Sequence, residues 1–96
     1  MTGRALARPD CAPSLAAHMR LRFDKARETW TIQAPERAFL LDEVAHAIVS
    51  RCDGAATLRA IVDDLWRLYG EPPRETVEAD VVALIQDFAD KGVMTL

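Results

Sequence analysis

The sequence predicts an α+β domain in which a three-stranded antiparallel sheet precedes three helices. Two observations predict this class. Between residues 19 and 41 apolar and polar residues alternate, as they do in strands that bury one face. From residue 42 onwards apolar residues recur every three or four positions, as they do in helices. Because strands and helices are segregated along the chain, the pattern favours α+β over alternating α/β.

The first two strands form a predicted hairpin. Met19, Leu21 and Phe23 alternate with two arginines, which predicts a half-buried strand whose arginines face water. The segment 29–34 alternates in the same way, with Trp30, Ile32 and Ala34 on its apolar face. A polar stretch at residues 24–27 separates the two strands and suits a turn.

The third strand leads directly into the first helix. Pro35 ends the second strand because it has no N–H to give to a sheet. Residues 38–41 are an apolar run of strand length, and Asp42 has the chemistry of a helix N-cap. We expect the first helix to run through residues 44–52 and to stop at Asp53-Gly54.

Two further helices complete the chain. Thr57 is the expected N-cap of the second, and Gly70 with the two prolines after it ends that helix. The third helix starts near Arg74 and is closed by Gly92. Its expected apolar stripe consists of Val77, Val81, Leu84 and Phe88. Residues 93–96 suit a short extended end.

The length of 96 residues fits one domain. Residues 1–14 contain two prolines and no periodicity, so we expect a mobile N-terminal tail followed by a single domain over 15–96. No apolar run approaches the ~20 residues needed to cross a bilayer. The first residues lack the apolar core of a secretory signal, which favours a cytoplasmic protein.

Catalytic and metal sites are not indicated. The candidate ligands and nucleophiles are Cys11, His18, His46 and Cys52, and no two of them are close in sequence. His46 and Cys52 differ by about 600° of helical rotation and point to opposite sides. The four glycines stand alone, so there is no phosphate-binding loop. We expect Cys52 to be a buried thiol and Cys11 to have no role.

Nucleic-acid binding is the alternative that the helix order raises, since three helices with a small sheet are also what a winged-helix domain contains. Residues 1–34 carry six basic and three acidic groups, whereas residues 35–96 carry six basic and twelve acidic groups. The third helix, which enters the major groove in winged-helix proteins, is acidic here. A helix of that sign lacks the counterion-release contribution that dominates affinity for DNA.

A binding module remains, and two features favour it. The strand at residues 38–41 has no obvious strand to pair with on its far side, and an open apolar edge is a template for strand addition by a peptide. The apolar surface of the third helix is also extended to one side by Val82, Ile85 and Ala89. These residues either line a groove beside the sheet edge or pack against the other helices. The pattern alone leaves both interpretations open.

The order and spacing of several short motifs resemble those of the PqqD family, the peptide chaperones of pyrroloquinoline quinone (PQQ) biosynthesis. The resemblance covers residues 15–96. Its motifs are Arg20-Leu-Arg-Phe-Asp24, Trp30, Pro35-Glu36, Leu41-Asp42, Cys52-Asp-Gly54, Ile61, Leu65, Asp80-Val81 and Leu84.

The resemblance implies a winged-helix-like peptide-recognition domain that catalyses nothing and holds no cofactor. Such a protein binds the ribosomal precursor peptide and presents it to a radical SAM enzyme, which joins a Glu and a Tyr of the peptide. The peptide is expected to add as a strand in a groove bounded by the third helix. Carried onto this sequence, the peptide-binding residues are Ala38, Phe39, Leu40, Leu41, Val82, Ile85 and Ala89.

The same open edge also predicts self-association. An unpaired strand can pair with a second copy of the chain or exchange its hairpin with it. We therefore expect a monomer or a weak, domain-swapped homodimer. Partners other than the precursor peptide and the radical SAM enzyme, such as nucleic acid or a membrane, are not expected.

Overall fold

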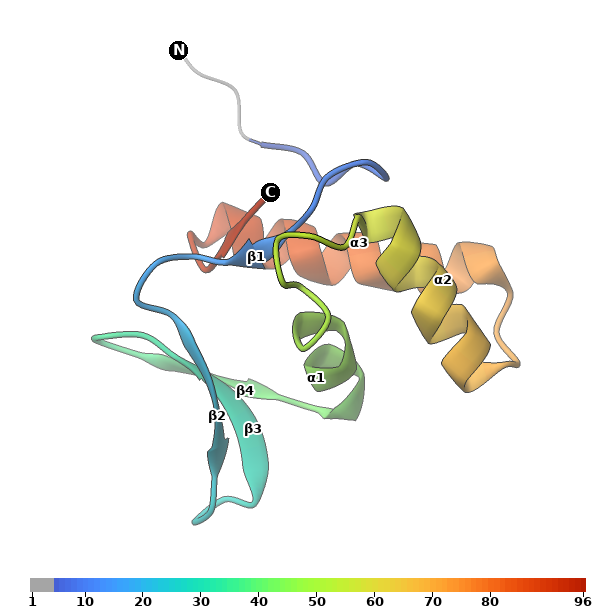
Figure 1. Cartoon of the computed structure of the whole chain (residues 1–96). Helices are drawn as coiled ribbons and strands as arrows, with labels where there is room; N and C mark the ends of the chain where they lie inside the picture. Colours follow the sequence, from blue (N-terminus) through green and yellow to red (C-terminus); the bar gives the residue numbers. More distant parts are fainter. Residues whose placement is uncertain (1–4) are drawn as a thin grey trace.

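The computed structural model describes residues 5–96 and contains two small sheets and three helices (Figure 1). The elements follow one another as β1 (Ser14–Leu15), β2 (Arg20–Asp24), β3 (Thr29–Gln33), β4 (Ala38–Leu41), α1 (Glu43–Val49), α2 (Leu58–Tyr69), α3 (Arg74–Asp90) and β5 (Met94–Thr95). The predicted order of three strands and then three helices is confirmed. None of these helices is both long and apolar enough to span a bilayer, within the part of the chain described.

The larger sheet has the antiparallel order β2-β3-β4 and one apolar face. Its cross-strand pairs place apolar residues side by side in two rows, which are Leu21, Ile32 and Phe39, and Phe23, Trp30 and Leu41. The opposite face carries the row Arg22, Thr31 and Leu40. Because side chains alternate along a strand, the sequence pattern placed each residue on the correct face. The β2–β3 hairpin projects away from the helices (Figure 1).

Side-chain caps and glycines set the helix boundaries. The Asp42 carboxylate accepts from the backbone N–H of Ala45 at 2.7 Å, and the Thr57 hydroxyl accepts from that of Ala60 at 3.1 Å. Gly70 ends α2 in the left-handed conformation with φ of 77°, which costs a glycine little. Both predicted N-caps are therefore confirmed.

The first helix ends earlier than predicted. It stops at Val49, and Cys52 lies in the turn that follows rather than on the helix. The reason is local hydrogen bonding. Arg51 donates to Ile48 and Cys52 donates to Val49, which tightens the chain into three-residue turns before Gly54.

The segment expected to be a mobile tail makes specific contacts over its described part. Gln86 on α3 accepts from the N–H of Ala7 at 2.8 Å and donates to the carbonyl of Ala5 at 2.9 Å. The carbonyls of Pro9 and Cys11 accept from the first N–H groups of α2, which have no partner within the helix. β1 then pairs with β5 at the opposite end of the chain. Residues 1–4 lie outside the described residues.

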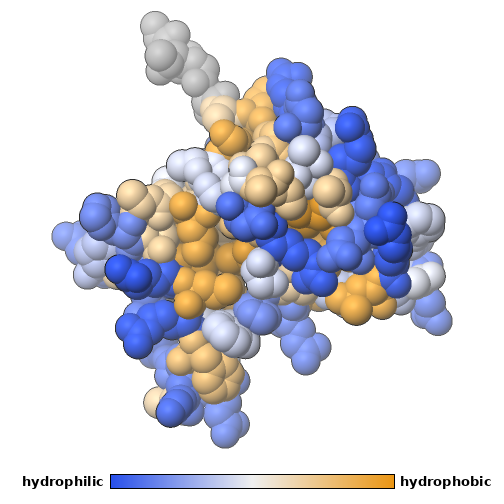
Figure 2. Space-filling model, in the orientation of Figure 1, coloured by the Kyte–Doolittle hydropathy of each residue, from blue (hydrophilic) through white to orange (hydrophobic). Residues whose placement is uncertain are grey.

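The core lies between the apolar face of the sheet and the three helices. Its fully buried side chains come from every layer, and the largest are Ile32, Ile48, Leu58, Ile61, Leu65 and Ile85. Further apolar side chains gather on the surface where the sheet meets the helical part (Figure 2). Arg74 at the start of α3 forms an ion pair of 2.7 Å with Asp63 on α2, which links these two helices at their polar edge.

Ile85 belongs to this core and not to a surface. Its side chain is 0% exposed, whereas Val82 and Ala89 on the same helix are half-buried. The sequence grouped these three residues as one extension of the apolar stripe. The correction follows from packing. Ile85 faces the protein interior, so it cannot line a surface groove without unfolding of the domain.

We expect Ile85→Ala to lower the free energy of unfolding by about 2–5 kcal/mol, because it removes a fully buried side chain and leaves a cavity. Urea unfolding followed by circular dichroism measures this change. Val82→Ala is the matched control, since it shortens a half-buried side chain on the same helix and should cost clearly less. Equal losses for the two variants would contradict the assignment of Ile85 to the core.

Candidate functional site

The outer edge of β4 is open. β4 pairs with β3 on one side, and no strand of the described chain pairs with it on the other. The N–H of Ala34 donates to the carbonyl of Arg37 at 2.9 Å, and the Thr29 hydroxyl donates to the carbonyl of Leu41. Since these bonds fix the alternation of an antiparallel ladder, the N–H and C=O groups of Ala38 and Leu40 point away from the sheet.

The side chains of β4 face two different surroundings. Leu41 is buried and Phe39 half-buried on the helical face of the sheet. Leu40 points to the other face, where its side chain is 60% exposed. A strand added at this edge would likewise direct every second side chain towards the helices.

The C-terminal half of α3 lies beside β4. The rings of Phe39 and Phe88 make an edge-to-face contact with centroids 5.8 Å apart. Arg37, just before β4, donates from Nη2 to the carbonyl of Lys91 at 3.0 Å and covers the Phe39 ring at 4.9 Å. These contacts join the C-terminal end of α3 to β4.

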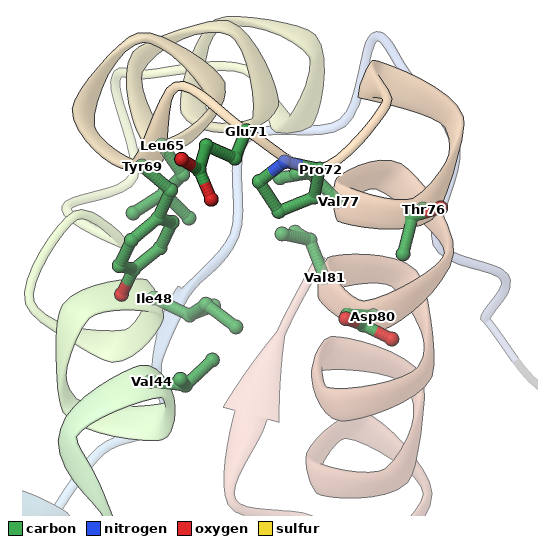
Figure 3. A pocket seen from close by; sticks show the side chains of 10 residues that line it. All are labelled: Val44, Ile48, Leu65, Tyr69, Glu71, Pro72, Thr76, Val77, Asp80 and Val81. Atoms are coloured by element: carbon green, nitrogen blue, oxygen red, sulfur yellow. The ribbon is translucent and has the colours of Figure 1, made fainter.

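A cavity of about 400 Å³ lies between α1 and α3. Val44 and Ile48 approach it from α1, while Val77, Val81 and Asp80 approach it from α3 (Figure 3). The remaining lining residues are Leu65, Tyr69, Glu71, Pro72 and Thr76. The walls are mostly apolar and the two carboxylates belong to exposed residues. The cavity is therefore suited to an apolar side chain with polar groups at its mouth. We use the name β4–α3 groove for the surface around Arg37, Phe39 and Phe88 together with this cavity.

The predicted site residues do not all lie on this groove. Residues 38–41 form β4 as expected, but Val82 and Ala89 lie within about 60° of Gln86 around the axis of α3. Gln86 bonds to the N-terminal segment, so this side of the helix faces residues 5–7. The side beside β4 carries Phe88 instead.

Val77, Asp80 and Val81 were not among the predicted site residues. Val77 and Val81 are buried, as expected for the apolar stripe of α3, whereas Asp80 is exposed. All three line the cavity. The signal was present in the sequence, as an acidic residue directly beside an apolar stripe. Which side of α3 lies next to β4 depends on the position of the N-terminal segment. The periodicity of α3 contains no information about that position.

Cys52 and His46 are engaged in packing. Cys52 is buried and donates from Sγ to the carbonyl of Ile48 at 3.2 Å. Burial raises the pKa of the Cys52 thiol to about 12, and the neighbouring charges of Asp53 and Cys11 add to this rise. The ring of His46 stacks on Trp30 with centroids 4.4 Å apart. Among residues 5–96, no three side chains of the metal-binding types come together.

Amide hydrogen exchange provides a test of the open edge. We expect the amides of Ala38 and Leu40 to exchange quickly in the native protein, because their N–H groups have no partner in the sheet. The amides of Phe39 and Leu41 should be protected by the ladder with β3. Two-dimensional NMR after transfer to D₂O measures all four. Uniform protection along β4 would show that the edge is covered.

Comparison with known proteins places the chain in a family. The family model for coenzyme PQQ synthesis protein D (PqqD) matches residues 29–94. A PqqA binding protein of Rhodopseudomonas palustris (strain BisB5) is 46% identical over 83 residues, which cover 86% of this chain and 80% of the relative. One of Xanthomonas oryzae pv. oryzae (strain PXO99A) is 36% identical, over 91% of this chain and 94% of the relative.

Two solved structures share the fold. The solution structure of the PqqD truncation of Methylobacterium extorquens PqqCD is 34% identical, with a TM-score of 0.74 over 88% of each chain. It represents a functional, stand-alone recognition element for ribosomally synthesised and post-translationally modified peptides (RiPPs). The crystal structure of PqqD from Xanthomonas campestris is 33% identical, with a TM-score of 0.59 over 96% of this chain and all of the other. The chain belongs to the PqqD family.

Proposed function

We propose that this protein is a non-catalytic chaperone of PQQ biosynthesis that binds the ribosomal precursor peptide, PqqA, by strand addition to β4. Relatives with up to 47% identity are named PqqA binding proteins, and one similar structure is a RiPP recognition element. The observation that carries the proposal is the open edge of β4, whose unpaired N–H and C=O groups belong to Ala38 and Leu40.

Strand addition divides the work of recognition between backbone and side chains. Main-chain hydrogen bonds to Ala38 and Leu40 are available to almost any extended peptide and supply affinity without strong sequence preference. Side chains of the peptide that face α3 would meet Phe88 and then the cavity at Val44 and Val81. A few apolar residues placed there would fix the register of the peptide.

The short length of β4 is compatible with presentation of the bound peptide to a radical SAM enzyme. The strand is only four residues long, so a longer peptide bound along it extends beyond β4. An enzyme that joins a Glu and a Tyr by a carbon–carbon bond needs those residues free. We propose that the enzyme acts on these two residues while the chaperone holds another part of the peptide. The enzyme would contact the chaperone through a surface separate from the β4–α3 groove.

The variant Leu40→Pro tests strand addition directly. Proline removes the outward N–H of Leu40 and leaves the partner carbonyl of the peptide without a donor. We expect affinity for synthetic PqqA, measured by calorimetry, to fall by about tenfold or more. Proline at such an edge position does not break the ladder with β3.

Two controls isolate the main-chain contribution. Leu40→Ala keeps the N–H and should bind nearly as the parent does. Phe23→Pro places the same residue on the opposite edge of the sheet and should leave affinity unchanged. Helicity by circular dichroism must be retained in each variant. A folded Leu40→Pro protein that binds PqqA with undiminished affinity would contradict strand addition at β4.

A further inference from the structure

One end of the β4–α3 groove carries a positive charge. The Arg37 guanidinium donates one hydrogen bond to the carbonyl of Lys91 and lies over the Phe39 ring. These two contacts hold the guanidinium between β4 and the end of α3. It forms no ion pair with a carboxylate in the described part of the chain. The nearby Lys91 ammonium is paired with Asp87 at 2.9 Å. Arg37 therefore keeps its charge and most of its N–H groups for a ligand.

The other end carries negative charge. Asp80 and Glu71 lie at the cavity, the first on α3 and the second in the turn before it. Figure 3 shows Asp80 near Val81 on α3 and Glu71 next to Tyr69 and Pro72 at another part of the cavity rim. Neither carboxylate forms an ion pair or a hydrogen bond with another described residue. They differ in this from Asp63 and Asp64 on α2, which are both paired with arginines.

The separation of the two ends can be expressed in peptide residues. From Lys91, the contact of Arg37, back to Asp80 is eleven residues along α3, or about 16 Å at the rise of an α-helix. An extended peptide covers that distance in about five residues. Both charged ends are thus within reach of one bound strand.

We propose that the β4–α3 groove selects a peptide segment with an acidic residue at the Arg37 end and a basic residue about five positions away, at Asp80 and Glu71. Apolar side chains between them face Phe88 and the cavity. This inference rests on the proposed function and adds to it the direction in which the peptide strand binds. The edge of a sheet accepts a strand in either direction, whereas opposite charges at the two ends favour one direction for a given peptide.

Charge-neutralising variants of the protein test the proposal with synthetic PqqA as the probe. Arg37→Gln and Asp80→Asn should each weaken binding by about two- to fivefold at low salt, the range of an exposed ion pair. The difference from the parent should vanish in about 0.5 M NaCl, where charges at this range are screened. Glu75→Gln, on the far side of α3, and Arg20→Gln, on the far edge of the sheet, are matched controls expected to bind as the parent does.

Variants of the peptide identify which of its residues pair with Arg37 and with Asp80. Each acidic and each basic residue of PqqA is neutralised in turn and tested against the three proteins. One acidic residue should lose its effect on affinity only in Arg37→Gln, and one basic residue, about five positions away, only in Asp80→Asn. Such coupling identifies the two ion pairs.

The outcomes separate this inference from the proposed function. If the parent binds PqqA and both protein variants bind it equally well at low salt, the polarity of the groove is refuted while peptide binding stands. Coupling of Arg37 to a basic residue, or of Asp80 to an acidic one, refutes it as well. If the folded parent does not bind PqqA, the proposed function fails together with the inference.

Discussion

The unpaired edge of β4 is the constraint on which the rest of the structure depends. β4 must pair with β3 on one side and remain open on the other, although open edges invite aggregation. Its position is fixed by burial of Leu41 in the core, by the contact of Phe39 with Phe88 and by the direct passage into α1 through the Asp42 cap. A strand held at three points can stay extended without a second neighbour.

The groove beside this edge is preformed because α3 is held from several directions. Ile85 anchors it in the core, Phe88 contacts β4, and Gln86 bonds to the N-terminal segment. At its start, Arg74 joins it to Asp63 on α2. For the proposed peptide, a rigid groove would avoid the entropic cost of ordering both partners on binding. The N-terminal segment thereby helps to position α3.

Most of the fold could be predicted from the sequence because its signals are local. The alternation of Leu21, Phe23, Trp30 and Ile32 determines which face of each strand is buried, and Asp42, Thr57 and Gly70 fix helix ends through their own chemistry. The early end of α1 was missed because the turn after Val49 depends on backbone hydrogen bonds that any residue can make.

For the candidate site, the sequence predicts the open strand edge but not the side of α3 that lies next to it. The open edge at residues 38–41 follows from counting strands, which a sequence allows. The side of α3 that faces the edge depends on the packing of residues far apart in the chain, such as Ala7 against Gln86 and Phe39 against Phe88. Periodicity shows that a helix has an apolar stripe, but not which side of that stripe contacts a neighbouring strand or helix.

Titration of the isotope-labelled protein with synthetic PqqA, followed by amide NMR, tests the central claim most directly. Strand addition in the β4–α3 groove predicts the largest shifts at residues 38–41 and at Val77, Val81 and Phe88 on α3. The opposite side of α3, at Val82 and Ala89, should change less. Shifts confined to β2 or to that opposite side, or no shifts in the folded protein, would contradict the account.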